Sequence, residues 1–130
     1  DHEVNLKGIC LKPNMIIDGS LQTEKSSKIL IAEKTIECFK DTVPEEVPGI
    51  VFLSGGQSEV EATENLDQMN KIGGFPWNLS FSYGRALQAS ALKVWSGEES
   101  NEELASNAFE HRAKMNSLAT LGKWEEELES

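Results

Sequence analysis

The chain has 130 residues, of which 38% are hydrophobic and 26% are charged, and its 22 acidic and 12 basic groups give a formal net charge of −10. This length suits one globular domain and is too short for two. No apolar run approaches the roughly 20 residues of a membrane helix, and the first ten residues lack the basic start and apolar centre of a signal peptide. The sequence therefore predicts a soluble, untargeted domain without a membrane partner.

The charge balance and the cysteine content exclude several kinds of partner and site. Nucleic-acid binding requires clustered Lys and Arg, so the acidic balance excludes nucleic acid as a general partner. The only cysteines, Cys10 and Cys38, lie in apolar patterns, and we expect two buried thiols in a reducing compartment. Together with His2 and His111 they match no structural zinc spacing, so no metal is predicted.

Three times the sequence passes from a short β-prone run through a turn into an amphipathic segment of helix length. The first run extends from Val4 to Met15, and its strand should end near Lys12 because Pro13 cannot donate to a ladder. A helix is predicted from Thr23 to Asp41. Its apolar stripe repeats every three or four residues and consists of Ile29, Ala32, Ile36 and Phe39.

The second unit begins with the continuous apolar run from Gly49 to Leu53, which is typical of a parallel strand covered on both faces. The run stops at Ser54-Gly55-Gly56. A helix is predicted directly after this turn, with Ser58 as its cap and carboxylates in its first turn. Its stripe consists of Ala62, Leu66 and Met69, and the Gly-Gly-Phe-Pro link at 73–76 ends it.

The third unit consists of an alternating strand from Trp77 to Tyr83, the turn Gly84-Arg85, and a helix that carries Leu87, Ala91 and Val94. A last helix is predicted from Asn101 to Leu121, with a stripe of Leu104, Ala108, Met115 and Leu118. The final WEEELES has the charge of a solvated tail. We therefore divide the chain into three βα units at 1–97 and a C-terminal helix with an acidic tail at 98–130.

Two strand-to-helix turns have the form of anion sites. Glycines at such a turn expose backbone N–H groups beside the positive end of the helix dipole, which suits a phosphate. Ser54, Gly55 and Gly56 have this placement, and Gly84 with Arg85 has it again, with a guanidinium able to bind phosphate through two hydrogen bonds. The alternative is that each glycine only relieves backbone strain.

Lys12 is the third candidate because it follows the strand before these two turns. In a parallel sheet this position places its amine at the same edge as the turns. A lysine there can form a Schiff base if desolvation or a neighbouring cation favours the neutral amine. The alternative reading of Lys12 is an ordinary surface lysine.

Four segments carry a resemblance to one enzyme family: LKPNM around Lys12, GIVFLSGGQSEVEATENLDQMNK, LSFSYGRALQASALK and AKMNSLATLGK. They closely resemble class I fructose-1,6-bisphosphate aldolase, and they span nearly the whole chain. The resemblance implies a (β/α)8 TIM barrel. It also implies reversible aldol cleavage of fructose 1,6-bisphosphate to dihydroxyacetone phosphate and glyceraldehyde 3-phosphate, without a metal or other cofactor.

The resemblance assigns roles residue by residue. The lysine of the LKPNM motif is the family's Schiff-base residue, which is Lys12 here. The SGG turn resembles one half of the family's phosphate cradle and SYGR the other half. The phosphate-binding residues implied in this way are Ser54, Gly55, Gly56, Ser82, Gly84 and Arg85.

The length departs from the family pattern, because a barrel takes roughly 200 residues or more. The sequence resembles the last three βα units of an aldolase, and the acid–base groups of the family's earlier strands have no matching position. The chain is then either a fragment of a longer aldolase or one half of a barrel that a second polypeptide completes. In both cases we expect the chain alone to be inactive and to need the remainder of the barrel as a partner. The resemblance further implies a cytoplasmic homotetramer. The alternative is a non-catalytic aldolase-derived binding or scaffold protein, which an intact-mass measurement on the natural protein would help to distinguish.

Overall fold

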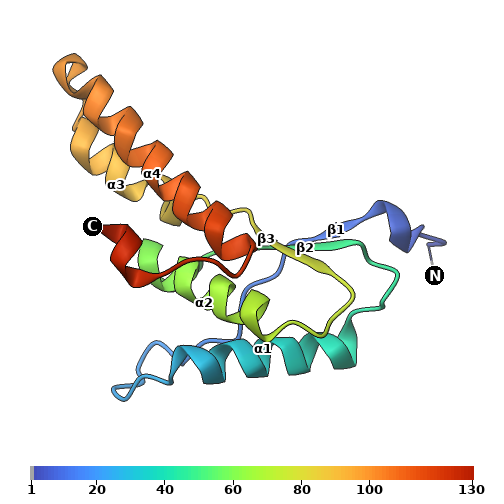
Figure 1. Ribbon diagram of the computed structural model, residues 1–130. Helices are drawn as coiled ribbons and strands as arrows, with labels where there is room; N and C mark the ends of the chain where they lie inside the picture. Colours follow the sequence, from blue (N-terminus) through green and yellow to red (C-terminus); the bar gives the residue numbers. More distant parts are fainter. Residues whose placement is uncertain (1) are drawn as a thin grey trace.

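The fold, seen in a computed structural model that describes residues 2–130, is a three-stranded parallel sheet with four α-helices (Figure 1). The strands are β1 (Cys10–Leu11), β2 (Gly49–Phe52) and β3 (Asn78–Phe81). The helices are α1 (Lys28–Thr42), α2 (Glu59–Ile72), α3 (Arg85–Trp95) and α4 (Glu102–Thr120). Short 3₁₀ segments lie at Leu6–Gly8, Glu99–Asn101 and Glu126–Glu129. The three predicted βα units and the last helix are therefore confirmed.

The sheet has the order β1-β2-β3, with both pairs parallel. Leu11 is aligned with Ile50, and Ile50 in turn with Leu79. Neither β1 nor β3 has a strand partner on its outer side within residues 2–130. Because the strands are parallel, all three end at the same edge of the sheet. The outer sides of β1 and β3 are unpaired within the described residues.

Helices cover one face of this sheet. Ile50, Phe52 and Leu79 are at most 3% exposed, and the ring of Phe52 stacks on Phe39 of α1 with centroids 5.7 Å apart. Figure 1 shows α1 and α2 on the same side of the strands. Because side chains alternate across a strand, Val51 belongs to the opposite face, where it is half-buried. The predicted cover on both faces of this strand is thus wrong for the described residues.

Helix α2 is the best-predicted element. Ser58 accepts a hydrogen bond from the Glu61 amide, and the Glu61 carboxylate accepts one from the Ser58 amide, so a complete capping box begins the helix. The predicted stripe of Ala62, Leu66 and Met69 is fully buried. The pattern succeeded here because α2 is packed between α1 and α4 along its apolar face.

The first unit differs from its prediction in the length of its strand and in the burial of its cysteines. Leu6–Gly8 forms a 3₁₀ turn, capped by the side chain of Asn5, so that the strand is limited to Cys10–Leu11. Cys10 is exposed and Cys38 is half-buried, which makes the prediction of two buried thiols wrong, although both cysteines are free. Cys10 is exposed because it lies on the sheet face that no described helix covers.

The helix after this strand begins five residues later than predicted. Asp18 accepts hydrogen bonds from the amide and the hydroxyl of Ser26, which closes a loop where the helix was expected to start. Ser27 then caps α1 by accepting from the Leu30 amide. Ile29 is 56% exposed because it lies in the first turn of α1, away from the buried Ala32, Ile36 and Phe39.

Helices α3 and α4 pack against each other and project beyond the sheet (Figure 1). In consequence only Ala86 of α3 is buried, and the predicted stripe residues Val94 and Leu104 are exposed. Met115 is buried near the other end of α4, where that helix reaches α2. The apolar pattern predicted both helices correctly but not the extent of their burial.

Most of the predicted solvated tail is exposed, but Trp124 and Glu129 pack onto α2 and α4. Trp124 is 5% exposed, and its backbone amide donates to the buried carboxylate of Asp67 at 3.0 Å. The carboxylate of Glu129 accepts from the Trp124 indole at 2.8 Å and from the Arg112 guanidinium at 2.9 and 2.5 Å. An acidic run was expected to remain in solvent, but a buried arginine binds one of its carboxylates.

Acidification is expected to weaken this attachment through Glu129. Burial disfavours its charged form, but hydrogen bonds from Arg112 and Trp124 outweigh burial, so the pKa of Glu129 lies below its ordinary value. Such a group stabilises the fold above its unfolded-state pKa of about 4.3, and this contribution is lost as the pH falls through the folded-state pKa. In urea unfolding between about pH 7 and about pH 3, the unfolding free energy should fall more in the wild type than in Glu129→Gln. Equal losses would contradict the assignment.

Candidate functional site

The candidate residues gather where the three strands end. Beyond β1 and β2 the ladder continues, because the amide of Leu53 donates to the carbonyl oxygen of Pro13 at 3.0 Å. In the same way the amide of Ser82 donates to the carbonyl oxygen of Phe52 at 2.8 Å. These two bonds bring Lys12, the Ser54–Gly56 turn and the segment 82–85 to one edge of the sheet.

Lys12 lies on the open face of the sheet at this edge. Leu11 is aligned with the buried Ile50, so the next residue is aligned with Val51, and Val51 with Ser80. Alternation places all three on the face opposite the helices. The Lys12 side chain is exposed, and its amine makes no hydrogen bond or ion pair within the part of the chain that the structure describes.

The Ser54–Gly56 turn has a shape that favours glycine at its end. Gly56 has φ +78°, and a Cβ on it would lie 2.8 Å from Cδ1 of Ile17, so a side chain there would strain the backbone and displace Ile17. The turn is closed by the Gln57 amide, which donates to the carbonyl oxygen of Ser54 at 3.1 Å. The Gly55 and Gly56 amides have no acceptor within residues 2–130. They are therefore available to an anion.

The second turn opens α3. Gly84 is the N-cap of α3 and, having no side chain, supplies no cap hydrogen bond. The amides of the first turn of a helix need acceptors, and an anion can supply them at this end of α3. Arg85 is exposed and forms no ion pair within residues 2–130. In contrast, Ser58 and Glu61 already satisfy the start of α2.

Several residues that hold these turns were missed by the sequence reasoning. The Tyr83 hydroxyl donates to the carbonyl oxygen of Ala62 at 2.8 Å, which ties the second turn to α2, and burial raises the pKa of Tyr83. The Asn65 amide donates to the side-chain oxygen of Gln57 at 2.7 Å and so supports the first turn. Asn65 is 1% exposed, and a polar residue beside the stripe of α2 was the available signal.

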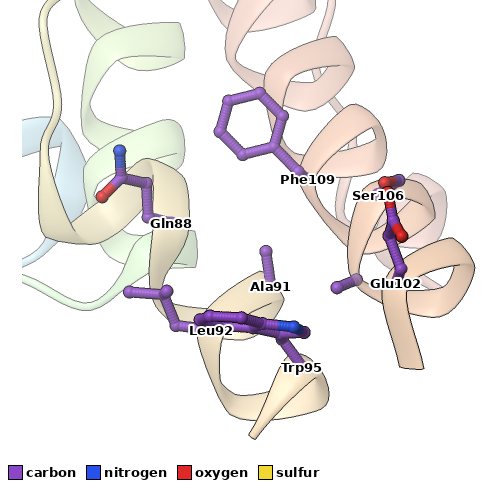
Figure 2. Close-up of a pocket in the computed structure, with 8 residues that line it drawn as sticks. Gln88, Ala91, Leu92, Trp95, Glu102, Ser106 and Phe109 are labelled. Atoms are coloured by element: carbon purple, nitrogen blue, oxygen red, sulfur yellow. The ribbon is translucent and has the colours of Figure 1, made fainter. Parts of the chain in front are cut away.

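A separate groove of about 420 Å³ lies between α3 and α4, and Figure 2 shows the residues that line it. Its walls are formed mainly by Leu92 and Trp95 from α3 and by Phe109 from α4. Glu102 is the one acidic side chain on its walls, and no basic side chain lines it. The groove therefore offers apolar surface but no pair of groups for acid–base chemistry, and none of the sequence-predicted site residues lines it.

Two further findings concern the described residues as a whole. No group of three or more His, Cys, Asp or Glu side chains within residues 2–130 is placed to hold a metal ion. None of the helices in this part of the chain is both long and apolar enough to cross a membrane.

Comparison with known proteins gives consistent results. The family model of class-I fructose-bisphosphate aldolase matches residues 1–130. The chain is 51% identical over 124 residues to a fructose-bisphosphate aldolase of Dictyostelium discoideum, covering 95% of this chain and 35% of that protein. It is 55% identical over 126 residues to the cytoplasmic isozyme of Spinacia oleracea, covering 96% of this chain and again 35% of the relative.

The fold agrees with the sequence match. The structure of fructose-bisphosphate aldolase from Plasmodium falciparum, in complex with TRAP and a small-molecule inhibitor, superposes with a TM-score of 0.91 at 48% identity, covering 95% of this chain and 35% of that one. The chain thus spans about a third of the length of these relatives, as expected for part of a barrel. With its whole length matched by one family model, the chain belongs to the class I fructose-bisphosphate aldolase family.

Proposed function

We propose that this chain supplies the Schiff-base lysine of a fructose-bisphosphate aldolase and a set of phosphate-binding residues. These residues, called the phosphate grip below, are those of the Ser54–Gly56 turn and the Ser82–Arg85 segment. The observation that carries the proposal is the convergence of Lys12, the Ser54–Gly56 turn and the Ser82–Arg85 segment at one edge of the sheet, in a chain of the aldolase family. The substrate is fructose 1,6-bisphosphate, and the products are dihydroxyacetone phosphate and glyceraldehyde 3-phosphate.

Lys12 is the nucleophile in this proposal. Its neutral amine attacks the C2 ketone of the open-chain sugar, and loss of water leaves a protonated iminium. The bond between C3 and C4 then breaks, the C4 hydroxyl loses its proton, and the bonding electrons move into the iminium to give an enamine. Protonation of the enamine at C3 and hydrolysis of the resulting iminium release dihydroxyacetone phosphate and free Lys12.

The phosphate grip positions the ketone over Lys12. The free amides of Gly55 and Gly56, the hydroxyls of Ser54 and Ser82, the open start of α3 at Gly84, and the Arg85 guanidinium would surround one phosphate. Holding the reacting groups in place can contribute several kcal/mol to the lowering of a barrier. Proton transfer by positioned side chains contributes about 10²-fold to 10⁴-fold to a reaction rate. The family's residues for this step have no matching position in this chain.

The assembly follows from the same proposal. The remaining two thirds of the barrel would pair with the open edges of β1 and β3 and would supply the acid–base groups. The complete enzyme is proposed to be a homotetramer of the cytoplasm, in line with relatives named as cytoplasmic and cytosolic isozymes. Aldol-cleavage activity of the natural protein, with its intact mass measured in parallel, tests this directly. A full-length natural protein without the activity would contradict it.

Replacing Arg85 by Ala is expected to weaken binding of fructose 1,6-bisphosphate about 10-fold to 100-fold, as loss of a hydrogen bond to a charged group does. The matched control is Lys93→Ala, which removes an exposed cation from the last turn of the same helix. Titration calorimetry of the assembled barrel provides both dissociation constants. Equal effects of the two substitutions would remove Arg85 from the site.

A further inference from the structure

A carboxylate ties together the two helices that follow the anion turns. Glu59 is the first residue of α2, and its side chain reaches across to α3. One carboxylate oxygen accepts from the backbone amide of Ser90 at 3.2 Å, and the other accepts a short hydrogen bond from the Ser90 hydroxyl. The side chain of Glu59 is only 19% exposed. Glu59 is thus held by two hydrogen bonds at a helix–helix contact.

Stabilisation of the start of α2 does not explain why the Glu59 side chain points to α3. A carboxylate is favourable in the first turn of a helix because of the dipole, but Ser58 and Glu61 already close the start of α2. Glu59 instead faces α3. Behind it the guanidinium of Arg112 lies 4.0 Å from a Glu59 oxygen, and Arg112 is itself held by Glu129. These neighbours fix the direction of the Glu59 side chain.

The position of this tie matters for the candidate site. Glu59 follows Gly56 by three residues, and Ser90 follows Arg85 by five residues on α3. The described hydrogen bonds between this first part of α3, with its preceding turn, and α2 are those of Tyr83 to Ala62 and of Ser90 to Glu59. Packing against α4 holds one side of α3, and these two attachment points fix the start of α3 relative to α2.

We propose that Glu59 is a positioning residue for phosphate binding. By holding Ser90 it sets the rotation of α3 and thereby the place of Arg85 relative to the Ser54–Gly56 turn. The two turns then bind one phosphate together, and neither binds it alone with the same strength. The proposal rests on the proposed phosphate site and adds to it a residue that does not touch the ligand.

Titration of the assembled barrel with inorganic phosphate, with ¹⁵N label in this chain only, tests the proposal. The amide signals of Gly55, Gly56, Gly84 and Arg85 are the readouts, because they report on each turn separately. In the wild type all four are expected to shift with one common midpoint. In Ser90→Ala the affinity should fall about tenfold, within the usual range of coupling between sites, and the two turns should titrate with different midpoints.

Three companion variants separate positioning from a general loss of structure. Glu59→Ala should reproduce the effect of Ser90→Ala, and the double variant should be no worse than either single one, because both remove the same tie. Ser90→Thr keeps the hydroxyl and should restore the common midpoint. Ser96→Ala removes a hydroxyl from the other end of α3, where it bonds only its own helix, and should leave the affinity unchanged.

The outcomes distinguish this inference from the proposed function. If the wild-type amides shift with phosphate and Ser90→Ala shifts at the same midpoint, the positioning role is wrong while the phosphate site stands. If the wild-type amides do not respond to phosphate, the phosphate site in this chain is wrong and the inference falls with it. Should Glu59→Ala fail to fold, Ser90→Ala and Ser90→Thr decide the question, since they change one small side chain.

Discussion

Borohydride reduction in the presence of dihydroxyacetone phosphate is expected to leave a covalent adduct on Lys12 alone when the full barrel is assembled. Borohydride converts an iminium into a stable amine, so the adduct marks the lysine that formed the Schiff base. Lys12 is the candidate because it directly follows β1 on the open face of the sheet, at the edge where both glycine turns lie. Peptide mass mapping locates the label.

The controls use other lysines of the same chain. Lys7 precedes β1 and Lys93 lies in the last turn of α3, so both are exposed amines away from this edge. A label on either of them with Lys12 unmodified would refute the assignment. Lys12→Arg should trap no adduct, because a guanidinium stays protonated and forms no iminium.

The same borohydride experiment can be carried out on the isolated chain. We expect it to form no adduct, because the groups that move protons to and from the lysine have no match in this sequence. If the 130 residues alone trap dihydroxyacetone phosphate on Lys12, these three βα units build more of the site than the phosphate grip and the nucleophile.

Arg112→Ala is expected to lower the free energy of unfolding by about 3 kcal/mol, near the lower end of the range for removing one partner of a buried ion pair. The Arg112 side chain is 7% exposed and binds Glu129 through two hydrogen bonds and Thr63 through a third. Its removal leaves the Glu129 carboxylate without its cation at a site that is 15% exposed. Urea unfolding measures the change.

The matched control breaks an ion pair at the surface. Lys34 lies 2.6 Å from Glu37, and their side chains are 56% and 61% exposed. Lys34→Ala should lower the free energy of unfolding far less than Arg112→Ala does, because solvent screens such a pair. The attachment of the C-terminal segment by Arg112 would be refuted if the two substitutions had equal effects on the free energy of unfolding.

The order of elements and the edge that carries the candidate site could be predicted from the sequence. Glycine turns, helix caps and apolar periods act over a few residues, so they state where an element starts and stops whatever surrounds it. Ser58 and Glu61 predicted the start of α2, and Pro13 predicted the end of the first strand. Because parallel strands share a carboxyl edge, Lys12, Gly56 and Arg85 were expected on the same side of the fold.

Burial and long-range polar contacts could not be predicted, because they depend on which element covers a given face. Cys10 has an apolar setting in the sequence, but no described helix covers its face of the sheet. Glu129 belongs to an acidic run, but Arg112 binds it from α4. The bond from Ser90 to Glu59 joins residues 31 positions apart.

Local backbone preference and side-chain period specify the three βα units, the two glycine turns and the lysine that follows the first strand, so these features could be read from the chain alone. Three other features depend on how the folded segments meet: Glu129 binds a buried arginine, Glu59 points toward α3, and one face of the sheet is open beside Lys12. These features arise from contacts between segments far apart in the chain, and no local pattern encodes such contacts.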